Sequence, residues 1–144
     1  MIYPASLTKL MTALILLDKY QLSDYIITKY PDNYENIGKV AYIPENIEIN
    51  IENLLKLLLV YSANDAAYIS ALAVTDNVDS FLILMNDKAK SLNMNDTNYS
   101  NPDGIDDSNH YTTLNDLLKL SIEISDNIEL LSIISKTKFV YEIS

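Results

Sequence analysis

Apolar residues recur at helical spacing near the start of the chain and predict a first helix over residues 6–19. The residues that carry this pattern are Leu7, Leu10, Met11, Leu14, Ile15 and Leu17. Pro4 stands just before this segment, where proline suits the start of a helix. A second helix is predicted from about Asn50, a good N-cap, to Val60. It is apolar nearly all round, so we expect it to be buried.

Further helices follow after the short interruption "YSAN" at 61–64. The next segment, "DAAYISALAV", predicts a helix over 65–74, and an amphipathic pattern predicts another over 77–91. A further helix is expected to begin after Thr113 or Thr112, with Asp116 near the capping-box position, and to end near Ile124. A short helix near 127–134 is the last one predicted.

Extended structure is predicted only in short pieces. Residues 23–49 contain β-leaning stretches, "YIIT" at 25–28 and "VAYI" at 40–43, separated by Pro-Asp-Asn and Pro-Glu-Asn turn signals. Near the end, "KTKFVYEI" at 136–143 alternates as a strand does. Residues 95–112 form a long polar loop, a feature that is often functional. We therefore predict one mostly α domain with minor β content and an incomplete sheet.

Composition removes several function classes. The 144 residues carry a net charge of −10 and no arginine, which argues against binding to nucleic acid or to an acidic membrane surface. Only two glycines occur, so a glycine-rich phosphate loop is excluded. Without cysteine, and with His110 as the sole histidine, thiolate and histidine metal sites are not expected, and no cofactor is implied. The aspartates at 103, 106 and 107 lack the calcium-loop spacing.

No membrane-spanning segment is predicted, because the longest apolar run, "LLKLLLV" at 54–60, is short and contains Lys56. The opening "MIYPASLTK" has no basic region followed by an apolar stretch, so no signal peptide is expected within this chain.

Candidate chemistry begins in "YPASLTKLMTALILL", residues 3–17, where Ser6 and Lys9 lie one helical turn apart on the same face. A serine hydroxyl becomes a useful nucleophile when a base removes its proton, and a lysine kept neutral by burial and a nearby positive field can be that base. The helix N-terminus also offers an N–H group to an oxyanion. Taken alone, the pair has a second interpretation, in which Ser6 only caps the helix.

Three stretches in order resemble the D-alanyl-D-alanine carboxypeptidases among the penicillin-binding proteins: "PASLTKLMTA", "YSANDAAY" and "NPDGIDDSNHYTT". The resemblance covers almost the whole chain. It implies that residues 1–144 are a single partial catalytic domain, the helical core of an α/β fold of the β-lactamase and transpeptidase type. Strands before the nucleophile helix and the Lys-Thr-Gly strand are expected to lie outside it, as is any membrane anchor.

By this resemblance, Ser6 is the acylated nucleophile, Lys9 its general base, Ser62 a proton shuttle, and Asn64 the residue that binds the substrate's amide carbonyl. The implied reaction is acyl transfer from peptidoglycan stem peptides that end in D-Ala-D-Ala, outside the cytoplasmic membrane in the cell envelope. β-Lactam antibiotics would acylate the same serine. Neither a metal nor a nucleic acid is implied as a partner.

Two sequence matches are interpreted as decoys. "SDN" at 125–127 falls in a turn between helices and is explained by local capping. "KTK" at 136–138 has lysine where the family has the glycine that lets the backbone approach the ligand. His110 is interpreted as a structural residue of its loop. Asp103 stands where the family commonly has histidine, and the sequence does not say with what consequence.

Two other functions remain open at this point. A class A β-lactamase shares Ser-x-x-Lys, although no stretch here resembles its glutamate-bearing loop. Alternatively, the chain is a catalytically inactive, truncated helical domain, for which exposed apolar surface would be the favouring observation.

Overall fold

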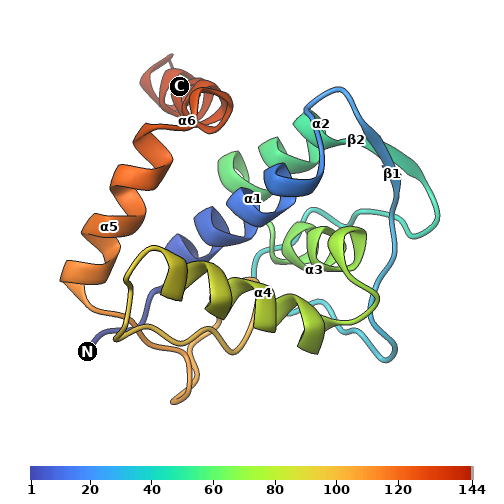
Figure 1. The fold of residues 1–144 in the computed structure, drawn as a ribbon. Helices are drawn as coiled ribbons and strands as arrows, with labels where there is room; N and C mark the ends of the chain where they lie inside the picture. Colours follow the sequence, from blue (N-terminus) through green and yellow to red (C-terminus); the bar gives the residue numbers. More distant parts are fainter. Residues whose placement is uncertain (144) are drawn as a thin grey trace.

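The computed structural model describes the backbone of residues 1–143 and the side chains of residues 1–135. Helices dominate, and the described strands form one small antiparallel pair (Figure 1). The elements are η1 (Ala5–Leu7), α1 (Thr8–Lys19), β1 (Tyr25–Ile27), β2 (Glu48–Asn50), α2 (Ile51–Leu55), the π-helical turn η2 (Lys56–Val60), α3 (Asn64–Val74), α4 (Val78–Ser91), α5 (Leu114–Ser125) and α6 (Ile128–Ile143). The predicted class, mostly α with minor β, is confirmed.

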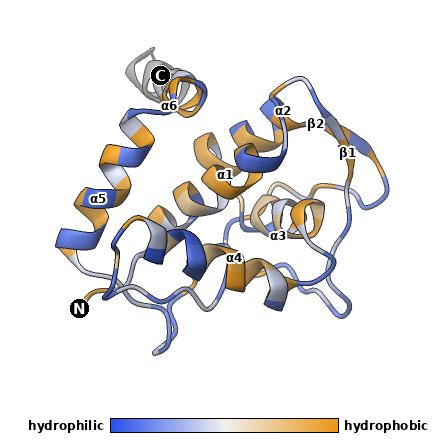
Figure 2. Cartoon of the chain, in the orientation of Figure 1, coloured by the Kyte–Doolittle hydropathy of each residue, from blue (hydrophilic) through white to orange (hydrophobic). Residues whose placement is uncertain are grey.

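Helix α1 runs through the middle of the molecule and contacts α3, α4, α5 and η2 (Figure 1). Its apolar side chains point to every side, and Met11, Ala13 and Leu16 are completely buried. A helix that is apolar all round is stable only when other elements cover it. Figure 2 shows the middle of α1 in hydrophobic colours, next to a similarly hydrophobic α3 and the mixed polar and apolar faces of α4 and α5. The core of the protein is therefore built around the helix that begins just after Ser6.

Side-chain caps begin three of the predicted helices, and two of them, Asn50 and Thr113, were predicted as caps. Asn50 accepts a hydrogen bond from the Asn53 amide at 2.7 Å and starts α2. Asn77 starts α4 in the same way, and Thr113 starts α5 by accepting from the Asp116 amide. These bonds satisfy amide groups that have no partner inside a first helical turn. The helices predicted over 6–19, 65–74, 77–91 and 113–124 are confirmed.

The strand prediction is right for 25–28 and wrong for 40–43. Strand β1 pairs with β2, with Ile26 opposite Ile49. Residues 40–43 form a loop, because the buried Asp65 carboxylate accepts hydrogen bonds from the amides of Ala41 and Ile43, both at 3.0 Å. The carboxylate accepts the amide hydrogen bonds that a neighbouring strand would accept in a sheet.

The strand expected over 136–143 is also wrong, because its backbone continues helix α6. A strand needs a neighbour for its backbone groups, whereas a helix satisfies them internally. The pair β1–β2 lies on the opposite side of the molecule from α6 (Figure 1), so it offers no edge to this segment. Among the described helices, none alone is long and apolar enough to cross a membrane, and α3 with α4 passes that test only as a pair bent by 90°.

The polar loop over 95–112 is held against α1 by buried hydrogen bonds. The ring of His110 is fully buried, with Nε2 2.7 Å from the Thr8 hydroxyl and Nδ1 2.8 Å from the Ser100 amide. Because the Ser100 amide can only donate, Nδ1 accepts, and the neutral ring donates from Nε2 to Thr8. Thr12, one turn further along α1, donates to the Pro102 carbonyl at 2.8 Å. The structural interpretation of His110 is thus supported.

We predict that His110→Asn weakens the dependence of stability on pH. Burial lowers the pKa of His110 below its usual 6.5, opposed by the carboxylates of Asp107 and Asp106. The unfolded chain therefore takes up the proton first, so the contribution of neutral His110 is complete above pH 6.5 and is lost as the pH falls below it. Asparagine retains an acceptor near the position of Nδ1 but does not titrate.

Urea unfolding of both proteins from about pH 5 to pH 8 measures this difference. We expect the variant to be less stable by about 1–3 kcal/mol at pH 8, since it loses the bond to Thr8. The gap should narrow as the pH falls. Unfolding free energies that run parallel over the whole range would contradict the assignment.

Candidate active site

Ser6 lies in the middle of the short turn η1, two residues before the first residue of α1, and its side chain is exposed. The chain reaches it through Ala5, whose φ of 49° lies in the left-handed region that residues with a side chain rarely adopt. Such strain is retained where the surroundings fix it, and it gathers at functional sites. The turn leaves the Ser6 hydroxyl free to approach a ligand at the positive end of α1.

Lys9 follows one turn later and is almost fully buried, with 4% of its surface exposed. Its amine makes no hydrogen bond or ion pair with any of the described side chains. Burial lowers the pKa of Lys9 from its usual 10.5; the negative charge of Asp103 raises it in part, and the positive charge of Lys39 lowers it further. Of the two conditions named for a lysine base, burial is present; a positive charge lies nearby as well, but the negative charge of Asp103 acts on Lys9 more strongly than the positive charge of Lys39 does.

Ser62 lies in the turn between η2 and α3 and has a φ of 55°, so it too is in the left-handed region. The turn is held by a bond of 3.0 Å from the Ala63 amide to the Leu57 carbonyl. This conformation costs about 1–3 kcal/mol for a residue with a side chain. Two of the predicted motifs therefore contain one strained residue each, Ala5 beside Ser6 and Ser62 itself.

Asn64 begins α3, and the loop before β2 fixes its orientation. Its Nδ2 donates to the Ile37 carbonyl at 2.9 Å, and its backbone amide donates to the Lys39 carbonyl at 2.8 Å. Gly38 lies between these two residues, and a Cβ there would come within 2.7 Å of Nδ2. The carboxamide of Asn64 thus has one N–H committed to the loop and keeps a second N–H and its oxygen for other partners.

The turn at 102–104 packs against the residue before the predicted nucleophile. Gly104 has a φ of 94°, and any Cβ at this position would overlap the Ala5 carbonyl oxygen. This contact and the Thr12–Pro102 bond hold the 3% exposed Asp103 close enough to Lys9 for the two charges to interact. The loop before β2 brings Lys39 close enough for its positive charge to act on Lys9.

The predicted residues lie in two pairs, one at the start of each of two helices that pack on one another. Ser6 and Lys9 share the start of α1, while Ser62 and Asn64 share the start of α3, the helix that packs along α1 (Figure 1). No hydrogen bond joins the first pair to the second among the described residues. Their link is Lys39, whose carbonyl holds Asn64 and whose charge acts on Lys9.

Sequence reasoning missed the roles of Lys39 and Gly38 and left Asp103 unexplained. One signal was available, because the chain has only two glycines. Both have positive φ, and each lies against a residue of a predicted motif, Gly38 on Asn64 and Gly104 on Ala5. In a glycine-poor chain, a glycine marks a place where the backbone needs this freedom.

The two decoys differ in outcome. Asn127 caps α6 by accepting from the Leu130 amide at 3.0 Å, which is the local capping expected for 125–127. The side chains of 136–138 lie outside the described residues. In the described part of the chain, no cluster of three or more histidine or acidic side chains is arranged to hold a metal ion.

Residues 1–144 match the sequence model of the family described as D-alanyl-D-alanine carboxypeptidase. The chain belongs to this family. Its helical structure also matches a crystal structure of the D-alanyl-D-alanine carboxypeptidase DacD from Francisella tularensis, with a TM-score of 0.81 and 29% identity over 92% of this chain and 33% of the other. The predicted fold, a helical portion of the carboxypeptidase fold, is confirmed.

Curated relatives give the same family. The carboxypeptidase DacF of Bacillus subtilis is 30% identical over 127 residues, which cover 84% of this chain and 32% of the relative. The D-alanyl-D-alanine endopeptidase of Escherichia coli is 36% identical over 119 residues, 82% of this chain and 38% of the relative. The chain thus spans about a third of the length of these carboxypeptidase relatives. Penicillin-binding protein D2 of Listeria monocytogenes, solved in a cefotaxime-bound form, superposes with a TM-score of 0.71 and 28% identity over 90% of this chain and 55% of the other.

We predict that Gly104→Ala destabilises the protein by about 1–3 kcal/mol, since alanine cannot adopt the positive φ without strain and its Cβ overlaps the Ala5 carbonyl. Ser108→Ala, an exposed position in the same loop, is the matched control and should change stability by less than about 0.5 kcal/mol. Urea unfolding measures both variants. Equal stability of the two would show that the turn is not pinned against Ala5.

Proposed function

We propose that this protein is a serine-type D-Ala-D-Ala carboxypeptidase of the cell envelope, which trims peptidoglycan stem peptides through an acyl-enzyme on Ser6. The observation that carries the proposal is the buried Lys9, with its lowered pKa, one turn after an exposed serine at a helix N-terminus. Membership of the carboxypeptidase family supplies the substrate class. The cefotaxime-bound form of the Listeria relative supports β-lactams as ligands of this protein.

The reaction uses the four predicted residues in turn. The neutral amine of Lys9 takes the proton of the Ser6 hydroxyl, and the oxygen attacks the carbonyl carbon between the two D-alanines. The Ser6 amide donates to the oxyanion. Ser62 passes a proton to the leaving amine, D-alanine departs, and water then hydrolyses the ester. Asn64 positions the substrate amide with the N–H that the loop leaves free.

One part of the family's machinery has no counterpart in this sequence, because Lys-Thr-Gly does not occur in it. That strand would supply a cation near the lysine base and a neighbouring oxyanion donor. The loss of one oxyanion donor slows acyl transfer about 10²–10³-fold. Lys39 places a positive charge near Lys9 and can replace the missing cation. Because the second oxyanion donor is not replaced, we expect slow acylation by the isolated chain.

We predict that benzylpenicillin forms a covalent adduct with the chain and that Ser6→Ala abolishes it. Lys9→Met should slow the adduct at least about 10²-fold, because the proton then has no base. Ser125→Ala is the control, since it alters the second Ser-x-Asn stretch, which lies at the end of α5, and should leave the adduct unchanged. Intact-mass spectrometry over time measures all four proteins.

The same experiment separates the alternatives. A β-lactamase of class A type would hydrolyse the drug with turnover, so free penicilloate would accumulate without a lasting adduct. An inactive helical domain would show no adduct although it is folded. One feature favours an association surface in that case: Leu114, Leu118 and Ile122 form an exposed apolar stripe along α5.

We also predict opposite pH shifts for two variants of the charges around Lys9. Acylation speeds up as the pH rises through the pKa of Lys9, because only the neutral amine accepts a proton. Lys39→Gln removes a positive charge, raises that pKa and moves the rising limb to higher pH. Asp103→Asn removes a negative charge and moves it to lower pH.

The rate of adduct formation at a series of pH values measures these shifts. Lys119→Gln on α5 is the control and should leave the pH profile of adduct formation unchanged, because the Lys119 amine pairs with Asp116 and the Asn93 carbonyl. Shifts of both variants in the same direction would exclude Lys9 as the titrating base.

A further inference from the structure

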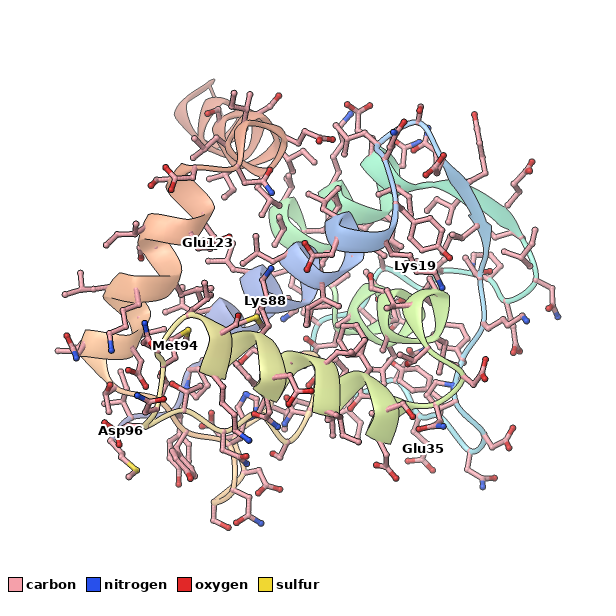
Figure 3. The ribbon with its side chains drawn as sticks, viewed as in Figure 1. Lys19, Glu35, Lys88, Met94, Asp96 and Glu123 are labelled. Carbon is pink, nitrogen blue, oxygen red and sulfur yellow. The ribbon has the colours of Figure 1, made fainter. Side chains whose placement is uncertain are left out.

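A cavity of about 320 Å³ lies between the loop before β2, helix α3 and the 102–105 turn. Two tyrosines, Tyr34 and Tyr68, and two carboxylates, Glu35 and Asp103, form part of its wall. Figure 3 shows Glu35 at the rim of the molecule, beside the first turn of α4. The lining contains no lysine, so the charges at this wall are negative only.

The aromatic side of the cavity is a packed row of rings. Tyr34 stacks on Tyr30 with centroids 4.7 Å apart, and Tyr68 lies 5.1 Å from Tyr34 at an angle of 54°. Burial raises the pKa of Tyr68 to about 12, and the charge of Asp103 adds to the effect, so its phenol stays neutral at physiological pH. Neutral tyrosine faces attract cations through the ring quadrupole.

The carboxylate of Asp103 is buried in this wall and held in place by its neighbours. It is 3% exposed, and its Oδ1 accepts a hydrogen bond from the Ile105 amide at 3.2 Å. Its backbone is fixed by the contact of Gly104 with Ala5 and by the bond from Thr12 to Pro102. A carboxylate that is buried beside a cavity gains most from a cationic partner in that cavity.

The cavity also adjoins the residues that the proposed reaction uses. Ile37, another of its lining residues, accepts the hydrogen bond from Asn64, and Asp103 interacts electrostatically with Lys9. We propose that this cavity binds the ammonium group of an amine-bearing peptide substrate, with Asp103 and Glu35 as its counter-charges and Tyr34 and Tyr68 as its faces. The identity of this ligand as a substrate rests on the proposed function, whereas its chemistry rests on the cavity.

The test compares two small probes that differ in one charge, Nα-acetyl-L-lysine amide and Nα-acetyl-L-norleucine amide. Titrations followed by the amide resonances of the full chain should show the lysine probe binding at least about fivefold tighter. The largest shifts should fall on Glu35, Tyr68 and Ile105. Equal affinities, or shifts confined to other parts of the chain, would overturn the proposal.

Substitutions of the two carboxylates test which residues cause the preference for the charged probe. Asp103→Asn and Glu35→Gln should each reduce the preference for the lysine probe, with the larger loss at the buried Asp103. Glu35 is exposed, so its variant tests the proposal even if Asp103→Asn does not fold. Glu123→Gln, which Figure 3 places on α5 away from Glu35, is the matched control and should keep the preference. A preference retained in both cavity variants would refute the site.

The penicillin adduct distinguishes this proposal from the proposed function. Selective binding of the lysine probe without an adduct on Ser6 would support the cavity and contradict catalysis by this chain. An adduct on Ser6 without any probe selectivity would support catalysis and contradict the cavity as an amine site. With both results positive, D-alanine should leave Nα-acetyl-L-Lys-D-Ala-D-Ala faster than its Nε-acetylated form.

Discussion

The arrangement of the candidate site depends on how the 95–112 loop docks on α1. That helix is buried on all sides, yet it carries the hydroxyls of Thr8 and Thr12, which must find partners inside the protein. His110 and the Pro102 carbonyl provide them. The bonds fix the turn at 102–104 against Ala5, and this one interface sets both the approach to Ser6 and the position of Asp103 beside Lys9.

A second buried group organises the opposite wall. The Asp65 carboxylate is completely buried and accepts hydrogen bonds from Ala41 and Ile43, while the neighbouring Asn64 holds Ile37 and Lys39. Two consecutive polar residues at the start of α3 thereby fasten a loop that has no strand partner. The same loop places the charge of Lys39 near Lys9 and contributes Tyr30 and Tyr34 to the row of stacked rings beside the cavity. Local caps and the electrostatics of the site are thus parts of one hydrogen-bonded arrangement.

The sequence predicted the helices well and the loops poorly, for physical reasons. Helical periodicity and caps such as Asn50, Asn77 and Thr113 act over one turn, so they are visible in a local window. The stretch 40–43 has the side chains of a strand, but its conformation is decided by Asp65, more than twenty residues away. The stretch 136–143 alternates as a strand does, but its backbone groups are satisfied within α6. Among the site residues, the sequence motifs predicted Ser6, Lys9, Ser62 and Asn64. The role of Lys39 was not predicted, because it belongs to no motif.

By itself the sequence determined the family, the order of the helices and the residues proposed for acyl transfer, because short motifs and apolar periodicity are written in consecutive positions. Only the tertiary structure decided the environment of those residues. The burial of Lys9, the opposing charges of Asp103 and Lys39, and the cavity lined by Tyr34 and Tyr68 all arise from contacts between distant segments. A pKa depends on burial and on charges nearby in space, and neither quantity is fixed until the loops before β2 and before α5 are folded against α1 and α3.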